Sequence, residues 1–457
     1  MGTSEFDEYK VDHLFLLIGE NPLPNYVAAK MLLNEGGKPY LVFSERTQKP
    51  AERLKEELGL SDEEMVPLNN NEANAYEIKK KIREKIKEIQ QRDREKSQQK
   101  DGYENSEKKL FGLNYTGGTK AMAVHAYQAF LLPDEKDPKS QLNPSPIFSY
   151  LDSSSLKMLI DHRGNPISLN IPNKQLKLSL EKLFKLHGLS LSNKKTSKDN
   201  IKTDVTLPEL VEAIVQNNLL WREWCQKILY IEAREQEEIA KIKKDNTTEI
   251  YFKIGNWKHH KELINVSFSI NGLPEIIVSI IKQNNMLQAD NKLNIQHLKD
   301  LNIFPKPSKN EDIPKEICKW FEGVWLEDYV LQQLKKIKEE CSLDEIGMSF
   351  NFPEKEDMAF FEFDVACLRG YQLFAISCTT DKTDNLCKSK LFEAYNRARL
   401  MGGNEARVAL VCYSNKVNKI KQAFMSQVDD PKVMVFGSGD IADLSEKLKN
   451  WIQTVDA

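Results

Sequence analysis

His13-Leu-Phe-Leu-Leu-Ile-Gly19 is a short, continuous apolar run that ends in glycine. Such a run is typical of a strand covered on both faces in a parallel sheet. Apolar residues recur at helical spacing from Asn25 to Glu35, and Gly36-Gly37 would end that helix in a left-handed cap. A second apolar strand over 38–44 and a charged helix from about 50 to 58 follow. This βαβα order predicts a doubly wound parallel sheet, whose ligands bind beyond the carboxyl ends of the strands.

The same alternation continues to about residue 165. Residues 77–109 are dominated by Lys, Glu, Gln and Arg, which predicts a helix running into an exposed loop. A basic arm for nucleic acid is the alternative, but acidic residues are interleaved throughout. A strand over 110–114 and a helix over 121–131 follow. Apolar runs over 147–151 and 156–160, separated by turn formers, predict an antiparallel hairpin that closes this domain.

Length and composition set the limits within which these patterns are interpreted. The chain has 457 residues, enough for two to four domains, and its 65 basic and 68 acidic residues give a formal charge of −3. A mean hydropathy of −0.53 and the absence of long apolar runs predict a soluble protein without a membrane span. Seven scattered cysteines form no CxxC pair, so we expect free thiols in a reducing cytoplasm and no structural zinc.

Composition changes after residue 165. Residues 166–310 are rich in Asn, Lys and Leu, with a helical seam over 178–186, a solvated run over 192–202 and a second helix over 208–218. We interpret this segment as a linking region of small helical and β pieces that carries no catalytic residue.

A separate domain is predicted from about residue 315 to 457. It begins with an amphipathic helix over 321–337. The elements expected after it are strands over 346–352, 360–368 and 372–379, a helix over 385–400 and a strand over 408–413. The order αβββαβ describes a small mixed sheet flanked by helices, so the whole chain belongs to the α/β class.

Two loops of the first domain have the composition of a phosphate site. The loop Gly19-Glu-Asn-Pro-Leu-Pro-Asn25 leaves the first strand, and Asn114-Tyr-Thr-Gly-Gly-Thr-Lys120 leaves a later one. Glycine lets backbone approach a ligand, the helix that opens at Thr119 presents N–H groups, and Lys120 adds a charge. The GxxxxGK[ST] pattern of a P-loop is absent. The alternative is a pair of tight turns that bind nothing.

Acidic and basic residues of the last domain form the second candidate. Glu327 lies on the amphipathic helix, and Asp364 lies in an apolar strand on the same face as Glu362 and Phe360. A buried acid is costly unless it is paired or bound to metal, and divalent cations prefer such hard oxygen ligands. The alternative is an exposed strand face beside a surface carboxylate. The helix from 386 to 402 adds basic residues that suit either phosphates or plain solvent exposure: Lys388, Lys390, Arg397 and Arg399.

The two glycine-containing loops resemble the ligand loops of CARF domains, the CRISPR-associated Rossmann folds. The last domain is similar to the PD-(D/E)XK-type domain of CARF-fused CRISPR ancillary nucleases. The resemblance covers about 11–165 and 315–440 and implies a Rossmann-like CARF domain over 11–165, a helical and β linker region over 166–310 and a restriction-endonuclease-like domain over 315–457. It also implies ligand-site residues Asn21, Asn25, Thr116, Gly117, Gly118, Thr119 and Lys120, with Asp152 at the rim.

Further implications concern partners and cofactors. In that family a CARF dimer binds a cyclic oligoadenylate made by an activated type III CRISPR complex and switches on metal-dependent cleavage of nucleic acid. The resemblance therefore implies a homodimer, cyclic tetra-adenylate or cyclic hexa-adenylate as activator with the tetra-adenylate preferred, Mn²⁺ or Mg²⁺ as cofactor, and DNA or RNA as substrate.

The nuclease motif is only partly retained. Trp325-Leu-Glu-Asp-Tyr-Val330 matches the helix with the first acid, Glu327, and Phe361-Glu-Phe-Asp364 matches the strand with the motif aspartate. The next strand should read Ile-Glu-Cys-Lys-Thr but reads Ile376-Ser-Cys-Thr-Thr380, so Ser377 and Thr379 replace the acid and the lysine. Glu327, Asp364 and the Cys378 carbonyl remain as metal ligands. Three residues are candidates for a lysine that has moved: Lys382, Lys388 and Lys390.

Two functions stay open at this point. One is a cyclic-oligoadenylate-activated, metal-dependent endonuclease with a variant active site, acting in type III CRISPR antiviral defence. The other is an oligoadenylate-binding effector whose nuclease fold has lost catalysis and acts by binding nucleic acid or a protein.

Overall fold

A computed structural model describes residues 4–99, 109–134, 137–152, 155–162, 165–172, 176, 178–189, 202–242, 248–304, 310–352 and 361–454. The end of the expected helix-and-loop segment (100–108), most of the run 192–202 and Phe360 lie outside these residues. Among the described helices, none has the length and apolar character needed to cross a bilayer.

The N-terminal domain is built on a seven-stranded sheet with the order β3-β2-β1-β4-β5-β6-β7. Its strands are β1 (Val11–Leu17), β2 (Leu33–Phe43), β3 (Met65–Pro67), β4 (Phe111–Asn114), β5 (Ile147–Asp152), β6 (Lys157–His162) and β7 (Asn165–Asn170). β3-β2-β1-β4-β5 are parallel, whereas β6 and β7 add antiparallel strands. The predicted doubly wound sheet and its closing hairpin are confirmed.

Helices cover both faces of this sheet. They are α1 (Leu23–Leu32), α2 (Gln48–Leu58), α3 (Ala75–Gln99) and α4 (Lys120–Leu131). α1 and α2 pack on one face, around Leu14 and Leu16, and α3 and α4 pack on the other, around Phe15 and Leu17. The alternation of buried side chains explains why β1 reads as an unbroken apolar run.

The predicted end of the first helix was wrong. α1 ends at Leu32, and Leu33 is already extended, so β2 begins there and runs through Gly36-Gly37. Gly36 has the left-handed conformation that was predicted, with φ +77°, but it lies within β2 and does not cap a helix. The long-range pairing of Leu33 with Val11 of β1 overrides the local helical pattern over 33–35.

The C-terminal domain is a five-stranded mixed sheet with the order β12-β13-β14-β15-β16. Its elements are α14 (Trp325–Lys336), β12 (Glu345–Phe352), β13 (Phe361–Arg369), β14 (Gln372–Thr379), α15 (Asp384–Gly402), β15 (Arg407–Cys412), α16 (Val417–Met425), β16 (Met434–Phe436) and α17 (Leu444–Thr454). The first three strands are antiparallel and the last three are parallel. The predicted order αβββαβ is confirmed, and α14 with α17 packs on one face while α15 with α16 packs on the other.

The segment between the two sheets has several parts. α6 (Leu180–Leu186) packs against α2, and the Leu180 amide donates to Glu345 of β12. The remaining elements are α7 (Pro208–Gln216), α8 (Asn218–Trp224), α9 (Tyr230–Ala233), β8 (Arg234–Ile242), β9 (Thr248–Trp257), α10 (His260–Leu263), β10 (Ser267–Ser269), α11 (Glu275–Gln283), β11 (Lys292–Asn294), α12 (Ile295–Asp300) and α13 (Ile313–Lys319). They share a hydrophobic core with α14, and β8 and β9 form a projecting hairpin.

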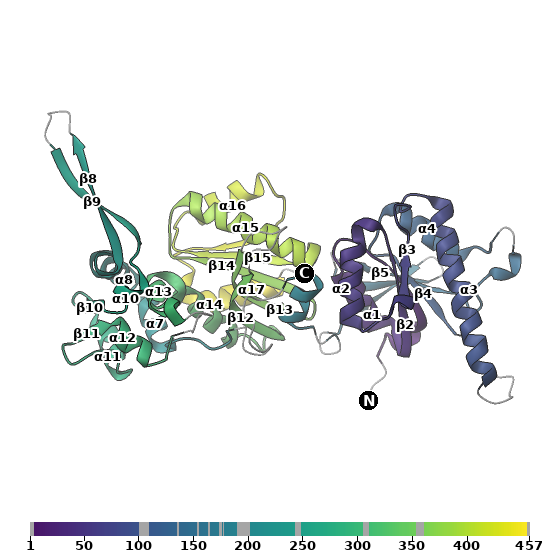
Figure 1. The fold of residues 1–457 in the computed structure, drawn as a ribbon, viewed down its shortest axis with the longest axis horizontal. Helices are drawn as coiled ribbons and strands as arrows, with labels where there is room; N and C mark the ends of the chain where they lie inside the picture. The colour runs from purple at the N-terminus through teal and green to yellow at the C-terminus, as the bar shows by residue number, and fades with distance from the viewer. Residues whose placement is uncertain are drawn as a thin grey trace.

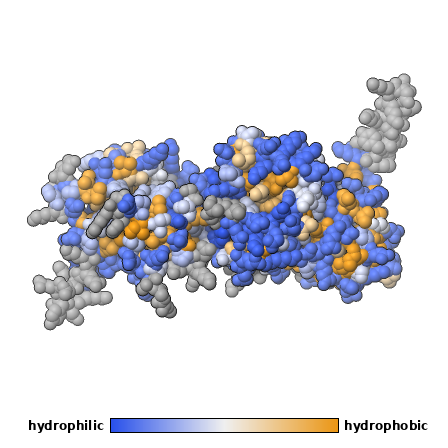
Figure 2. All heavy atoms as spheres, turned by 180° about the vertical axis from the view of Figure 1, so that it is seen from behind, coloured by the Kyte–Doolittle hydropathy of each residue, from blue (hydrophilic) through white to orange (hydrophobic). Residues whose placement is uncertain are grey.

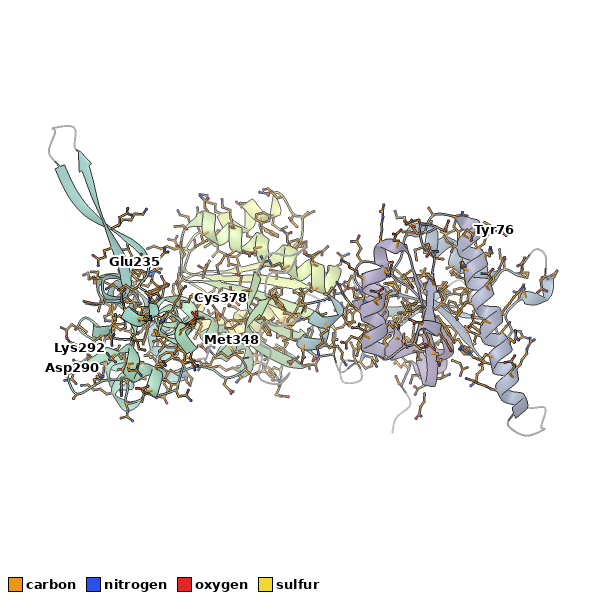
Figure 3. The ribbon with its side chains drawn as sticks, viewed as in Figure 1. Tyr76, Glu235, Asp290, Lys292, Met348 and Cys378 are labelled. Atoms are coloured by element: carbon orange, nitrogen blue, oxygen red, sulfur yellow. The ribbon has the colours of Figure 1, made fainter. Side chains whose placement is uncertain are left out.

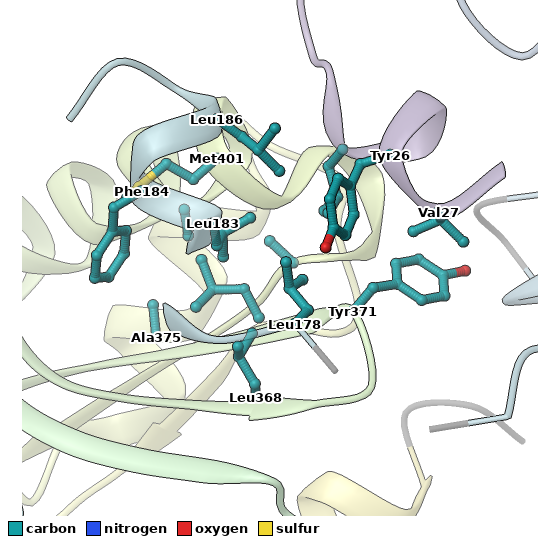
Figure 4. Close-up of a cluster of buried hydrophobic side chains, with 14 of the residues drawn as sticks. Tyr26, Val27, Leu178, Leu183, Phe184, Leu186, Leu368, Tyr371, Ala375 and Met401 are labelled. Carbon is teal, nitrogen blue, oxygen red and sulfur yellow. The ribbon is translucent and has the colours of Figure 1, made fainter. Parts of the chain in front are cut away.

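The order of these parts in space differs from their order in the chain. Figure 1 shows the N-terminal domain at one end, the C-terminal domain in the middle and the elements from α7 to α13 at the other end. The two sheet domains therefore contact each other directly. Apolar residues of α1, α6 and the C-terminal sheet meet between them, including Tyr26, Leu183 and Tyr371 (Figure 4). On the face in Figure 2, hydrophilic residues cover most of the middle domain, and apolar residues appear in small patches.

Candidate active site and ligand-binding edge

The candidate active site lies where β13 separates from β14. The pairing of these strands extends from Arg369↔Gln372 to Val365↔Ile376 and ends there, while β13 continues to pair with β12. Asp364 lies just beyond the last pair and faces Ser377 across the opening. The first turn of α14 contributes Glu327. Figure 3 shows Cys378, next to this opening on β14, in the middle of the C-terminal domain.

Three carboxylates converge at this opening. One oxygen each of Glu327, Glu362 and Asp364 lies within 4.8 Å of the others. The predicted pairing of Glu327 with Asp364 is thus present in space. The sequence predicts Glu362 on the same strand face as Asp364, but it was not predicted as a third member of the cluster; its i, i+2 spacing from Asp364 was the available clue.

Asp364 is held in place by β14. Only 8% of Asp364 is exposed, and its Oδ2 accepts hydrogen bonds from the Ser377 hydroxyl at 2.9 Å and the Cys378 amide at 2.6 Å. Ser377, which replaces the motif acid, therefore donates to the remaining aspartate. The Cys378 carbonyl accepts a hydrogen bond from Lys390 at 3.1 Å.

Lys390 of α15 is the predicted candidate that lies at the carboxylate cluster. Its Nζ lies 3.6 Å from Asp364 Oδ2. Of the three candidates for a moved lysine, Lys388 lies near Asp384 instead, and Lys382 lines a neighbouring cavity. Thr379, at the motif lysine position, accepts a hydrogen bond from the Asp381 amide and so supports the turn after β14.

The carboxylates repel one another and are partly removed from water. Burial raises the pKa of Glu327 well above its usual range, and the charges of Asp364 and Glu362 add to this effect. Lost hydration and the charge of Asp364 also raise the pKa of Glu362, although its side chain reaches solvent at the mouth of the cluster. Burial lowers the pKa of Lys390, but Asp364 and Glu327 outweigh it and the net pKa is raised, so this lysine stays charged.

Strand β12 also contributes to the cluster. Ser349 has φ +57°, a left-handed conformation that is uncommon for a residue other than glycine. Its hydroxyl lies 3.4 Å from Glu327 Oε2. The strand changes its buried face at this residue. The side chains before it, Ile346 and Met348, belong to one core cluster, and those after it, Phe350 and Phe352, belong to another. The change of face places a hydroxyl donor beside the acid of α14.

The donor set fits a hard divalent cation. Three carboxylates within 4.8 Å of one another offer only oxygen ligands, as Mg²⁺ and Mn²⁺ prefer. Burial, and after it the charges of Asp364 and Glu362, raise the pKa of Glu327, and the charge of Lys390 only partly opposes this shift. A bound cation would relieve this repulsion.

The carboxyl edge of the N-terminal sheet brings its two glycine-containing loops together. A Cβ at Gly117 would lie 2.2 Å from the Leu17 carbonyl, so only glycine fits there, and one at Gly19 would lie 3.3 Å from the Gly118 amide. Gly118 has φ +76°. The glycines at these positions are therefore explained by the close approach of the two loop backbones to each other.

Several residues expected at the ligand site support these loops. Asn25 is fully buried and donates through Nδ2 to the Leu17 carbonyl at 2.9 Å. The Thr116 hydroxyl accepts from the Leu151 amide at 2.7 Å, which ties the turn to β5. Thr119 caps α4 by accepting from the Met122 amide, and Lys120 beside it is exposed. Thr119 and Lys120 therefore have side chains on the open side of this edge.

Asn21 and Asp152 point toward the rest of the molecule. Asn21 Oδ1 lies 3.1 Å from Nε2 of His187, which follows α6. A Cβ at Gly403, just after α15, would lie 2.6 Å from Asn21 Nδ2. Asp152 ends β5 and is close enough to Tyr371 of the C-terminal domain to act on it electrostatically. The loop after β1 thus contacts both α6 and the end of α15.

The fold defines a class: a Rossmann-like domain joined to a second α/β domain with a mixed sheet, in the order that the sequence predicted. The chain shares this fold over nearly its full length with Can2 from Sulfobacillus thermosulfidooxidans, solved in complex with cyclic tetra-adenylate, at a TM-score of 0.61 and 15% identity, covering 96% of this chain and 99% of that one. Protein VC1899 from Vibrio cholerae matches at a TM-score of 0.64 and 15% identity, covering 97% and 98%. No protein-family model matches the chain, and no curated protein matches it in sequence.

Proposed function

We propose that the protein is a cyclic-oligoadenylate-activated, metal-dependent endonuclease that cleaves DNA or RNA in the cytoplasm as part of type III CRISPR defence. The observation that carries the proposal is the complete set of charges at the β13–β14 opening. Glu362 supplies the acid that β14 lacks, and Lys390 supplies the lysine. A nuclease fold that had lost catalysis would have no need to retain three carboxylates that repel one another and a half-buried lysine at one point.

Each residue of the cluster has a distinct role in this proposal. Glu327, Glu362 and Asp364 would hold Mn²⁺ or Mg²⁺, which when bound would lower the pKa of a water and polarise the scissile phosphate. Ser377 and the Cys378 amide orient Asp364, and Ser349 orients Glu327. Lys390 places a full positive charge at 3.6 Å from Asp364, where negative charge develops on the phosphate during attack.

The N-terminal edge is proposed as the activator site. Lys120 and the N-terminus of α4 offer a charge and the positive end of the helix dipole to the phosphates of a cyclic oligoadenylate, with cyclic tetra-adenylate preferred. The solved complex of Can2 with cyclic tetra-adenylate supports this choice. We propose residues 11–165 as the activator-binding domain and 315–457 as the nuclease domain.

We further propose a homodimer through α4. Val124 and Leu131 are separated by two helical turns and are 53% and 46% exposed, and Leu132 beside them is 53% exposed. A ring with internal rotational symmetry suits a two-fold axis, on which equal loops of two subunits each contact half of it. Val124→Asp should shift the sedimenting species from dimer to monomer; an unchanged dimer would refute this interface.

The test of the proposed function is a cleavage assay with separate substrates. The full chain is incubated with cyclic tetra-adenylate or hexa-adenylate, with Mn²⁺ or Mg²⁺, and with supercoiled plasmid, single-stranded DNA or single-stranded RNA. We expect cleavage that needs both activator and metal and that Asp364→Asn abolishes. Activator binding without any cleavage by the parent would instead establish an effector that acts by binding.

A further inference from the structure

A large polar cavity lies beside the acidic cluster and takes no part in the roles described so far. Its volume is about 800 Å³, within the range of sites that bind small molecules. α8 contributes Asn218 and Arg222, the segment before α15 contributes Lys382, and the loop after β15 contributes Tyr413 and Lys416. The cavity is therefore built by the helical part of the chain and the nuclease sheet together.

Arg222 connects this cavity to the candidate active site. A smaller cavity of about 450 Å³ is lined by Glu327 and Lys390 at the cluster and also by Arg222. Arg222 lines both cavities, so its side chain lies between the cavity at the carboxylates and the larger one. Arg222 is half-buried and forms no ion pair within the described part of the chain.

Polar groups without partners line the larger cavity. Asn218 is 9% exposed and its Nδ2 has no hydrogen-bond acceptor among the described residues. The buried hydroxyl of Tyr413 likewise has no partner there. A buried polar atom left unpaired costs free energy, and unexplained cases in a native structure indicate a ligand or ordered water. These two groups belong to different elements yet line the same space.

The charged side chains around the cavity favour an anionic ligand. Arg222, Lys382 and Lys416 line it, and the N-terminus of the long helix α15 opens onto it at Thr383. The acid at the start of that helix, Asp384, is paired with Lys419 at 2.8 Å. Three cations and a helix N-terminus suit a phosphate, while an amide and a phenol hydroxyl suit the polar edge of a base.

We propose that this cavity binds one nucleotide of a single-stranded substrate, next to the phosphate that the cluster cleaves. The inference rests on the proposed nuclease function and adds the substrate class. A cavity of this size admits a nucleotide turned out of a strand, whereas the paired bases of a duplex stay stacked inside the double helix. Arg222, between the two cavities, would then contact the backbone that joins this nucleotide to the scissile phosphate.

Binding in the absence of cleavage tests this subsite. Full-length Asp364→Asn protein is titrated into a fluorescein-labelled single-stranded oligonucleotide, as DNA and as RNA, and anisotropy gives Kd. Adding Arg222→Ala should raise Kd about tenfold or more, as expected for losing a charge-assisted phosphate contact. Tyr413→Phe retains the ring and removes the hydroxyl, so it should raise Kd by roughly threefold with no change in melting temperature.

The matched control is Lys227→Ala. Lys227 follows α8, is exposed, lines neither cavity and pairs with Glu223 at 2.5 Å, so its removal deletes an equal charge outside the cavities. We expect its Kd to stay within about twofold of the Asp364→Asn parent. Equal losses for Arg222→Ala and Lys227→Ala, or no loss for Arg222→Ala, would overturn the subsite. Equally tight binding of a duplex with the same dependence on Arg222 would overturn the single-stranded assignment.

These results are independent of the cleavage assay. If the native chain never cleaves but the Arg222 and Tyr413 effects are found, the nuclease function fails and the nucleotide subsite remains. If the native chain cleaves and neither effect is found, the subsite fails and the nuclease function remains.

Discussion

The side-chain nitrogen of Lys390 lies 3.6 Å from Oδ2 of Asp364, although Lys390 belongs to α15 and the nuclease motif carries its lysine on the strand that is β14 here. The same lysine donates to the Cys378 carbonyl at 3.1 Å. These two contacts hold the ammonium group at the carboxylate cluster.

Lys390→Ala is therefore expected to reduce the cleavage rate by about 100-fold or more, the effect of removing one preorganised electrostatic contact to a transition state. Activator binding should be unchanged, because the two sites lie in different domains. Lys388→Ala provides the control: the residue is on the same helix, beside Asp384 and away from the cluster. Equal rates for the Lys390 and Lys388 variants would exclude the catalytic role of Lys390.

Glu362→Gln should weaken Mn²⁺ binding by roughly tenfold or more, because one of three charged ligands is lost. Glu393→Gln is the matched control, since Glu393 lines the same opening but pairs with Arg397 at 2.7 Å. Isothermal titration calorimetry measures both. If the two variants bind Mn²⁺ alike, Glu362 is not a ligand.

Metal binding should also strengthen as the pH rises from about 6 to about 8. The pKa of Glu327 is raised by burial and by its neighbours, and the pKa of Glu362 is raised to about 7, so protons compete with the cation at the lower pH. Calorimetry in two buffers of different ionisation enthalpy should detect proton release on binding. A pH-independent affinity without proton release would contradict the carboxylate site.

Lys120→Ala should weaken the binding of cyclic tetra-adenylate by about 1–3 kcal/mol, as expected for the loss of a charge-assisted phosphate contact. Lys96→Ala removes an equal charge from the exposed surface of α3 and should leave the affinity unchanged. Calorimetric titration of both variants decides whether Lys120 faces the ligand.

The order of the helices and strands in both sheets could be predicted from the sequence, because buried strands and the helices that cover them have strong apolar patterns. It also placed Glu327, Asp364 and a moved lysine together, since the nuclease resemblance supplied their arrangement. Choosing Lys390 over Lys388 required the packing of α15. Glu362 was not predicted because the motif places its second acid on β14, at the position of Ser377. The third acid of the cluster lies instead on the neighbouring strand, β13.

Other features depend on contacts that no local pattern contains. Leu33 pairs with Val11 and turns the end of a helical pattern into a strand. Ser349 takes a left-handed conformation that only the two core faces around it explain. The contacts of Asn21 with His187 and Gly403 join parts of the chain that are far apart in sequence, so no local pattern could predict them.

The imidazole of His187 lies between the N-terminal and C-terminal domains. Its Nδ1 is 2.9 Å from the Leu183 carbonyl and its Nε2 is 3.1 Å from Asn21 Oδ1. Burial lowers the pKa of His187 to about 4, the Leu183 carbonyl opposes this shift, and Arg53 adds to it. The unfolded chain takes up a proton near pH 6.5, whereas the folded chain resists it until about pH 4. The stability due to neutral His187 is therefore complete above pH 6.5 and is lost as the pH falls.

At about pH 5 this linkage should cost on the order of 1–2 kcal/mol, after allowance for the partial exposure of the ring. Urea unfolding at pH 7 and pH 5 measures the loss in the free energy of unfolding. Because glutamine does not titrate, the loss between these pH values should be smaller by about 1–2 kcal/mol in the His187→Gln variant. Because Asn21 belongs to the loop that leaves β1, His187→Gln should also change the activator concentration needed for half-maximal cleavage. An identical pH dependence for parent and variant would show that His187 does not titrate between the domains.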